Sequence, residues 1–239
     1  MITEAIILAG GLGTRLRTAV PDLPKCMAPV AGKPFLHYLI KYLEKQGISR
    51  FIFSLGYKHE VIESFLNKEL ENSSVDFAVS VEDEPLGTGG AILKAAALAH
   101  SDSTIVLNGD TFFAISITQL SRLYKEKNAD CVLTLKPMKN SERYGVVDID
   151  LHQKITSFRE KQFYAEGLIN GGAYALNIPS LLKESLPEKF SFEKDYLEAF
   201  YGIRKFYGSE QDGYFIDIGI PEDFNRANID FKNFSIKYL

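Results

Sequence analysis

A glycine-rich segment near the N-terminus has the residue types needed to bind phosphate. Residues 8–17 read LAGGLGTRLR, with three glycines in four positions, and follow a short apolar run. Glycines let the backbone approach a ligand and direct N–H groups at oxygen atoms, while Arg15 and Arg17 add charged donors. A dinucleotide fingerprint would have a third glycine where Leu16 stands, and no Gly-Lys-Ser/Thr of a P-loop follows. We expect a phosphate-binding loop of another kind; the alternative is a turn with two solvated arginines.

A lysine on a stiff loop comes next. Lys25 stands in the stretch PKCMAPV at 24–30, between two prolines that restrict the backbone. A fixed ammonium close to a glycine-rich loop suits the stabilisation of a transferring phosphoryl group. An ordinary surface lysine is the alternative interpretation.

These residues need a framework, and the first half of the chain predicts one. Short apolar runs alternate with segments of helical periodicity. Strands are expected at 4–9, 51–55, 75–81, 104–108 and 130–135, and helices at 35–47, 61–66, 89–98 and 118–127. The alternation predicts right-handed crossovers and an α/β fold: a Rossmann-like, doubly wound, mixed and mostly parallel sheet.

After about residue 136 the pattern changes. We expect antiparallel strands at 145–149 and 155–159, further strands at 169–176 and 214–218, helices at 179–186 and 193–200, and a last helix opened by Pro221. No Pro/Ser-rich linker interrupts the sequence, so one domain over 1–239 is expected. Its nucleotide-binding half is 1–136, and 137–239 completes the site.

Chain order alone predicts where the polar loops gather. The glycine-rich loop, the segment 82–90 and the turn at 108–110 each follow a strand that is expected to be parallel. All three then lie at the carboxyl edge of the sheet, where open α/β sheets bind their ligands.

Composition excludes several classes of protein. The formal net charge is −4 over 239 residues, and an acidic chain without a basic run is not typical of a nucleic-acid binder. The two cysteines make neither a disulfide framework nor a cysteine-type zinc site. The start lacks the basic stretch of a secretory signal, and no segment approaches the roughly 18 apolar residues of a membrane span. We expect a cytoplasmic protein with neither nucleic-acid nor membrane partners.

The motifs together resemble those of the sugar-1-phosphate nucleotidyltransferase family. GGLGTRL at 10–16 is followed shortly by PKCMAPV, with Cys26 where family members usually have proline. The resemblance continues through LINGG at 168–172, FSFEKD at 190–195 and DGYFIDIGIPED at 212–223, and so covers essentially the whole chain. It implies an enzyme that joins a nucleoside triphosphate to a sugar 1-phosphate and releases pyrophosphate.

The resemblance implies a role for each matching residue. Catalysis is expected of Arg15, Lys25 and Asp110; nucleotide binding of Leu8, Gly10, Gly11, Gly13, Thr14, Arg15, Glu82, Gly87 and Thr88; sugar-phosphate binding of Asn108, Tyr144, Gly145, Glu160, Lys161, Asn170 and Gly171; and Mg²⁺ binding of Asp110 and Asp217. Each aspartate alone could be a turn or cap residue. Gln162 stands where relatives often have proline after the lysine.

The base and sugar follow from finer features. Glu82 matches a base-reading position, and a carboxylate can accept from both N1–H and the 2-amino group of guanine. The resemblance is strongest for members that use GTP and D-glycero-α-D-manno-heptose 1-phosphate, by Mg²⁺-assisted in-line attack on the α-phosphorus. Alternatives are mannose 1-phosphate with GTP, uridylyl or thymidylyl transfer to another hexose 1-phosphate, and a non-catalytic nucleotide-sugar sensor. A homodimer is also expected, from the apolar, aromatic-rich second half.

Overall fold

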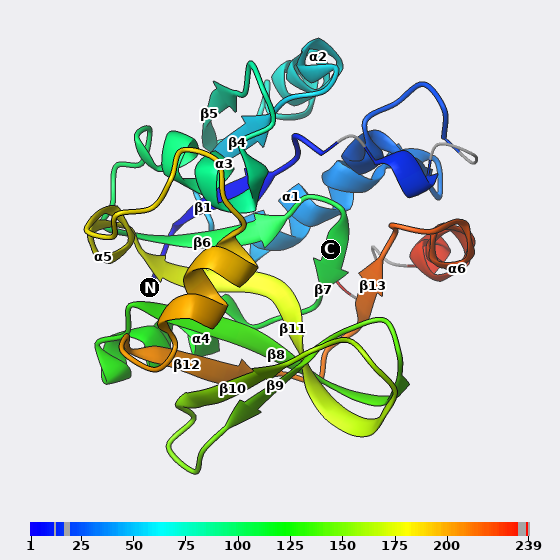
Figure 1. Cartoon of the computed structure of the whole chain (residues 1–239). Coiled ribbons are helices and arrows are strands. Elements are labelled where there is room, and N and C mark those ends of the chain that lie inside the picture. The colour runs from blue at the N-terminus through cyan, green and yellow to red at the C-terminus, as the bar shows by residue number, and fades with distance from the viewer. Residues whose placement is uncertain (12, 17–19, 234–237, 239) are drawn as a thin grey trace.

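The computed structural model describes residues 1–11, 13–16, 20–233 and 238, and a twisted sheet runs through its centre (Figure 1). Four parallel strands form one side of this sheet: β1 (Glu4–Leu8), β4 (Arg50–Leu55), β5 (Asp76–Val81) and β6 (Ser103–Asn108). They lie in the order β6-β1-β4-β5, so that the chain starts in the middle and winds outward.

One antiparallel strand joins the two halves of the chain. β11 (Tyr164–Asn177) pairs with β6 on one side and with β8 (Cys131–Ser141) on the other, both antiparallel. β12 (Phe206–Glu210) then pairs parallel with β8. Because only β11 reverses direction along this path, the prediction of a mixed, mostly parallel sheet is confirmed. The hairpin of β9 (Val146–Ile149) and β10 (Ile155–Arg159) branches from β11.

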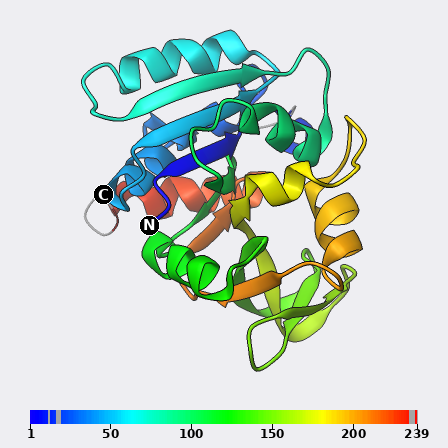
Figure 2. The ribbon, with the colours of Figure 1, turned by 90° about the vertical axis from the view of Figure 1, so that its left-hand side faces the viewer.

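Helices cover both faces of the sheet. Bounds of the helices are α1 (Phe35–Lys45), α2 (His59–Glu69), α3 (Gly87–Ala96), α4 (Ile117–Lys127), α5 (Ile178–Leu182) and α6 (Pro221–Asp230), with the short helices η1 (Thr14–Leu16), η2 (Lys25–Met27) and η4 (Phe231–Asn233) and the π-helix η3 (Phe192–Glu198). Figure 2 shows α2 and β5 at one end of the sheet and the β9–β10 hairpin at the opposite end. No helix in the described ranges is both long and apolar enough to cross a membrane.

The two faces bury separate hydrophobic cores because neighbouring side chains of a strand point to opposite sides. Ile7 of β1 packs with α1, α2 and α4, whereas its neighbour Ile6 packs with α3, α5 and η3. Phe51 and Ile52 of β4 divide in the same way. Both faces of the central strands are therefore apolar, which explains the continuous apolar runs in the sequence.

Two further pairs of short strands lie outside the central sheet. β7 (Thr111–Phe113) pairs antiparallel with β13 (Phe215–Asp217), and β2 (Pro29–Val30) pairs with β3 (Lys33–Pro34). The β7–β13 pair connects the end of β6 to a segment about a hundred residues later. It is this pair that brings two of the expected site residues together.

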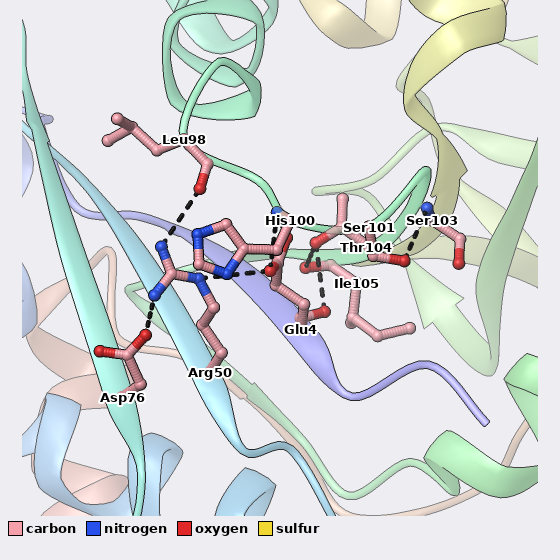
Figure 3. Close-up of polar contacts among 9 residues, drawn as sticks. All are labelled: Glu4, Arg50, Asp76, Leu98, His100, Ser101, Ser103, Thr104 and Ile105. Carbon is pink, nitrogen blue, oxygen red and sulfur yellow. Dashed lines mark hydrogen bonds and ion pairs between the residues drawn. The ribbon is translucent and has the colours of Figure 1, made fainter.

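The amino edge of the sheet is held by an ion-pair cluster around the buried Glu4 carboxylate, and the cluster reaches the surface at Asp76 (Figure 3). Glu4 of β1 is 4% exposed, and its carboxylate accepts from the backbone N–H of His100 at 3.1 and 3.2 Å. Arg50 Nε lies 3.3 Å from Glu4 Oε2, and the same guanidinium pairs with Asp76 and donates to the carbonyl of Leu98 at 3.2 Å. The cluster links β1, β4, β5 and the turn after α3, at the edge opposite the expected site.

The structure also departs from the expected elements. The strand expected at 130–135 continues to Ser141, and the one expected at 169–176 begins at Tyr164, because the two pair with each other along their extra length. The helix expected at 193–200 is a π-helix that begins at Phe192. β7 and β12 were not expected, since each is short and β12 contains Gly208.

Candidate active site

The polar loops lie together at the carboxyl edge, as the chain order predicted. Each loop is hydrogen-bonded, where it leaves its strand, to the end of a neighbouring strand. The backbone N–H groups of Ala9, Gly109 and Glu82 donate to the carbonyls of Ser54, Leu8 and Leu55 respectively, each at 2.8 Å. Above them opens a cleft of about 1050 Å³. The loops are thus fixed by the sheet that carries them.

Most of the residues expected to bind nucleotide or act in catalysis line this larger cleft. They are Leu8, Gly10, Gly11, Gly13, Arg15, Lys25, Glu82, Gly87, Thr88 and Asp110, together with Asn108 and Asp217. Thr14 begins the short helix η1. Leu12 and Arg17, part of the same glycine-rich motif, lie outside the described residues.

A second cavity, of about 470 Å³, adjoins the first. All seven residues expected to bind sugar phosphate line it: Asn108, Tyr144, Gly145, Glu160, Lys161, Asn170 and Gly171. The two cavities share Asn108, Thr111, Glu193 and Asp217. Two ligands bound in them would therefore meet at this common wall.

A lysine and two aspartates form the charged centre beside the common wall. Lys25 begins η2 directly after Pro24, and its Nζ lies 2.5 Å from Asp110 Oδ2 and 3.2 Å from Asp217 Oδ1. Pairing of Thr111 with Asp217 across β7 and β13 sets the two carboxylates side by side, and Ile218 N–H donates to the carbonyl of Asp110 at 3.1 Å. The Lys25 side chain is only 11% exposed, so water screens its charge poorly.

Two neighbouring groups are held in their neutral forms. Burial, with a smaller effect of the Asp110 charge, raises the pKa of Cys26 to about 12. Burial and then the charge of Asp217 raise the pKa of Tyr144 to about 12. Near neutral pH the Cys26 thiol and the Tyr144 phenol are uncharged, so neither adds a charge to the centre that Lys25, Asp110 and Asp217 form.

The two carboxylates suit a hard divalent cation. They converge on one cation in the structure, the Lys25 ammonium, and they come from the turn after β6 and from the end of β13. Among the described residues no cluster of three or more His, Cys, Asp or Glu side chains could hold a metal. A Mg²⁺ ion prefers one or two carboxylates together with phosphate oxygens and water, which is the donor set this site offers.

Glu82 is held in a fixed orientation in the larger cleft. Ser54 Oγ donates to its Oε1 at 3.2 Å, and the backbone N–H of Leu86 donates to its Oε2 at 2.9 Å. A Cβ at Gly10 would lie only 2.8 Å from Glu82 Oε1, so the glycine makes room for the carboxylate. Each carboxylate oxygen keeps a further lone pair for a ligand.

The glycines at 87–90 have a packing role that the sequence motifs did not suggest. Gly87 has φ +73°, and a Cβ there would lie 2.5 Å from the carbonyl oxygen of Phe190. A Cβ at Gly89 would lie 2.0 Å from the Phe190 ring. The segment before η3 therefore rests directly on the start of α3 and ties the second half of the chain to the nucleotide-binding half.

Sequence motifs missed several residues of the site. Glu193 lines both cavities and accepts from Thr88 Oγ1 at 2.7 Å, yet in the sequence it stood only in a stretch quoted for the family resemblance. Tyr57 and His59, at the carboxyl end of β4, line the larger cleft, and Tyr174 lines the smaller one. Tyr57 and His59 directly follow the parallel strand expected at 51–55, so the chain-order argument could have found them, whereas Tyr174 lies within β11 and only the fold places it at the site.

Comparison with known proteins gives the class of this molecule. Residues 4–233 match the family model described as nucleotidyl transferase. The chain therefore belongs to the nucleotidyl transferase family, and the resemblance noted in its motifs is confirmed. It is a nucleotidyltransferase with the fold that the sequence predicted.

Individual relatives are similar over nearly their whole length. The chain is 48% identical to D-glycero-alpha-D-manno-heptose 1-phosphate guanylyltransferase of Aneurinibacillus thermoaerophilus, over 97% of this chain and 99% of the relative. It is 44% identical to the protein of the same name from Campylobacter jejuni, over 92% and 96%. The crystal structure of HddC from Yersinia pseudotuberculosis matches with a TM-score of 0.85 and 38% identity, over 97% of this chain and 100% of that one. A structure of HddC complexed with GMP-PN matches with a TM-score of 0.84.

Proposed function

We propose that this enzyme transfers the guanylyl group of GTP to D-glycero-α-D-manno-heptose 1-phosphate, giving a GDP-heptose and pyrophosphate. The observation that carries the proposal is the pair of adjoining cavities with a common wall beside Lys25, Asp110 and Asp217. The names of the relatives from A. thermoaerophilus and C. jejuni, and the HddC complex with GMP-PN, support the choice of base and sugar.

The larger cleft would hold the nucleotide and the smaller cavity the sugar phosphate. Glycines and Arg15 line the first, next to the sheet edge where α/β folds bind phosphate. The second has Glu160 and Asn170 for hydroxyl groups and Lys161 for the phosphate. The α-phosphate of GTP then lies at the common wall, facing the phosphate of the sugar.

The reaction is an in-line displacement at phosphorus. An oxygen of the sugar phosphate forms the new bond to the α-phosphorus, while the bond from the α-phosphorus to the bridging oxygen breaks and pyrophosphate leaves. The attacking phosphate is already ionised, so positioning and charge neutralisation supply the catalysis without a general base. The main obstacle is repulsion between two anions.

Each cation would neutralise part of the negative charge that causes this repulsion. Lys25 would stabilise the charge that develops at the α-phosphate, Arg15 would hold the departing pyrophosphate, and Lys161 would hold the attacking phosphate. Asp110 and Asp217 would bind Mg²⁺, which neutralises phosphate charge when bound. Lys25 then lies between these carboxylates and the reacting phosphate, close to both.

Base selection would be made by Glu82. Its two oxygens are oriented by Ser54 and by the backbone of Leu86, and a carboxylate so fixed can accept from the N1–H and the 2-amino group of guanine. Uracil and thymine offer a single ring N–H donor, and would leave one oxygen without its partner.

Pyrophosphate release is the direct test. The purified protein is incubated with Mg²⁺, the heptose 1-phosphate and each of GTP, UTP, dTTP, ATP and CTP in turn. Release with GTP alone supports the base and the sugar together, and release with another nucleotide discards the guanine assignment. A parallel series with mannose 1-phosphate and glucose 1-phosphate tests the choice of sugar. If no pair of nucleotide and sugar phosphate releases pyrophosphate, the result favours the non-catalytic nucleotide-sugar sensor.

The remaining expectations belong to the same proposal. We propose a single domain over 1–239 that acts in the cytoplasm on these small-molecule substrates. The pairing of β6 with β11, which carries one sheet through both halves of the chain, supports the single domain. The homodimer stays a prediction, and sedimentation of the purified protein tests it.

A further inference from the structure

An ion pair fastens the loop that carries Tyr144 to helix α6. This loop, residues 142–145, joins β8 to β9, and the guanidinium of Arg143 pairs with the Asp223 carboxylate through Nη1 and Oδ2. Asp223 belongs to the first turn of α6 and is only 7% exposed. A buried carboxylate needs a cationic or hydrogen-bonding partner, so the loop is held where Asp223 places Arg143.

Arg143 also covers the aromatic ring of its neighbour in the chain. Its guanidinium carbon lies 5.5 Å from the centroid of the Tyr144 ring, within the range of a cation–π attraction. The ion pair with Asp223 fixes the direction of the guanidinium, and the guanidinium in turn limits the positions open to the ring. Arg143 therefore links α6 to Tyr144 by two contacts of its own.

A second aromatic residue supports the Tyr144 ring from β13. Phe215 meets it edge-on, with centroids 5.9 Å apart and an angle of 82° between the ring planes. Phe215 is itself packed edge-on against Phe113, its partner across the β7–β13 pair, with centroids 5.5 Å apart. Because Asp217 ends the same strand, Tyr144 is held at a fixed place relative to that expected metal ligand.

These contacts end at the smaller cavity. Tyr144 and Phe215 both line it, whereas Arg143 and Asp223 line neither cavity. The ion pair therefore acts on a ligand through the Tyr144 ring and not by a contact of its own.

We propose that Arg143 and Asp223 are positioning residues for the sugar 1-phosphate: their ion pair holds Tyr144 against Phe215 before the substrate binds. A wall that is already ordered need not be immobilised on binding, so the free energy of that ordering does not weaken the affinity. Without the pair, the substrate itself would have to order the loop at 142–145. This inference rests on the proposed function, which places the sugar phosphate in the smaller cavity.

Steady-state kinetics of Arg143→Met test this role. KM for the heptose 1-phosphate should rise about two- to tenfold, the effect of one more side chain that must be immobilised on binding, while KM for GTP stays unchanged. Arg143→Lys keeps a cation beside Asp223 and should recover part of the loss. Asp223→Asn should raise the same KM, and the double variant Arg143→Met/Asp223→Asn should be no worse than the weaker single variant, since all three remove one contact.

Arg226 provides a matched control on the same carboxylate. Its Nη2 lies 3.2 Å from Asp223 Oδ1, so Arg226→Met also takes a cation from Asp223. The Tyr144 ring, however, is flanked by Arg143 and Phe215. KM for the sugar phosphate should therefore stay at the wild-type value in Arg226→Met. Urea unfolding of both methionine variants checks that the KM values compare folded proteins.

Calorimetry on the full chain gives a second readout that needs no turnover, since the Kd of the sugar 1-phosphate should rise in Arg143→Met together with its KM. An unchanged KM in Arg143→Met, an equal rise in KM for both substrates, or an equal rise in Arg226→Met would each overturn the positioning role. A wrong substrate assignment is recognised separately, by wild-type turnover with a different nucleotide or sugar, and the same variants are then compared with that pair.

Discussion

Lys25 and Asp110 form a contact of 2.5 Å in the larger cleft, beside the wall that it shares with the smaller cavity. The lysine comes from a loop stiffened by Pro24, and the aspartate from the turn after β6, so the contact joins two loops that leave different strands. Asp217 lies 3.2 Å from the same ammonium. The lysine balances the two carboxylates, and in the proposed reaction it would also face a phosphate.

Replacing Lys25 by methionine should therefore lower kcat by about 10²-fold or more, the effect of removing one preorganised charge stabiliser. Methionine keeps the length of the side chain and removes its charge. Single-turnover pyrophosphate release measures the chemical step directly. Lys136→Met, at a cation that pairs with Asp212 outside both cavities, is the control and should keep full turnover.

Asp110→Asn should also reduce turnover by about 10²-fold or more, because a neutral amide is a poor ligand for Mg²⁺. Binding of Mn²⁺ by the protein with bound nucleotide analogue, followed by electron paramagnetic resonance, should weaken in parallel. Asp148→Asn changes a carboxylate outside both cavities and should leave both quantities unchanged. Near-normal turnover of Asp110→Asn would rule out its role as a metal ligand.

Gly89→Ala should destabilise the fold by about 1–3 kcal/mol, the usual cost of adding a methyl group to a packed interior. The added Cβ would lie 2.0 Å from the ring of Phe190, which is itself 4% exposed. Urea unfolding measures the loss. Gly202→Ala, where the added Cβ meets no atom within 4 Å, is the matched control, and an equal loss there would contradict the packing role.

Arg50→Met should destabilise the protein by about 3 kcal/mol without changing kcat. It leaves the Glu4 carboxylate buried without its cation, and breaking one side of a buried pair is costly. Arg122→Met removes an exposed partner 3.8 Å from Glu126 and should cost about 0.5 kcal/mol or less. Similar losses for the two variants would show that the cluster in Figure 3 adds little to stability.

Alkaline pH should destabilise the fold through the buried thiols. Burial raises the pKa of Cys26 from 9.0 to about 12 and also raises that of Cys131. Above pH 9.0 the thiol ionises in the unfolded chain but stays protonated in the folded protein, which favours unfolding. The free energy of unfolding is therefore unaffected by this thiol below pH 9.0 and falls as the pH rises toward about 12. The fall in urea midpoint between about pH 8 and about pH 10.5 should be smaller in Cys131→Ala than in the wild type. An equal fall in the two proteins would contradict a contribution from that thiol.

The sequence was most informative where periodicity and motif agreed. The strands that end at Leu8 and Asn108 are nearly continuous apolar runs, and the edge strand that ends at Val81 has Phe77, Val79 and Val81 on one face, so their positions, and the loops after them, could be predicted. The Phe206–Glu210 strand could not be predicted, because Gly208 and a serine interrupt its apolar residues. Only the pairing with β8 makes this segment a strand. Glu193 was missed for a similar reason, since its place between two cavities depends on contacts with residues 105 positions away.

Phe190 packs tightly against the glycines at the start of α3, and this packing has a consequence for protein engineering. The fit leaves no space for a methyl group at Gly89, so the segment that carries Glu193 and the turn that carries Thr88 can change only in concert. Chimeras that exchange residues 137–239 with those of a relative, to alter sugar choice, will need the donor's version of residues 86–90 as well. Directed evolution for a new sugar is best started from libraries that vary these two segments jointly.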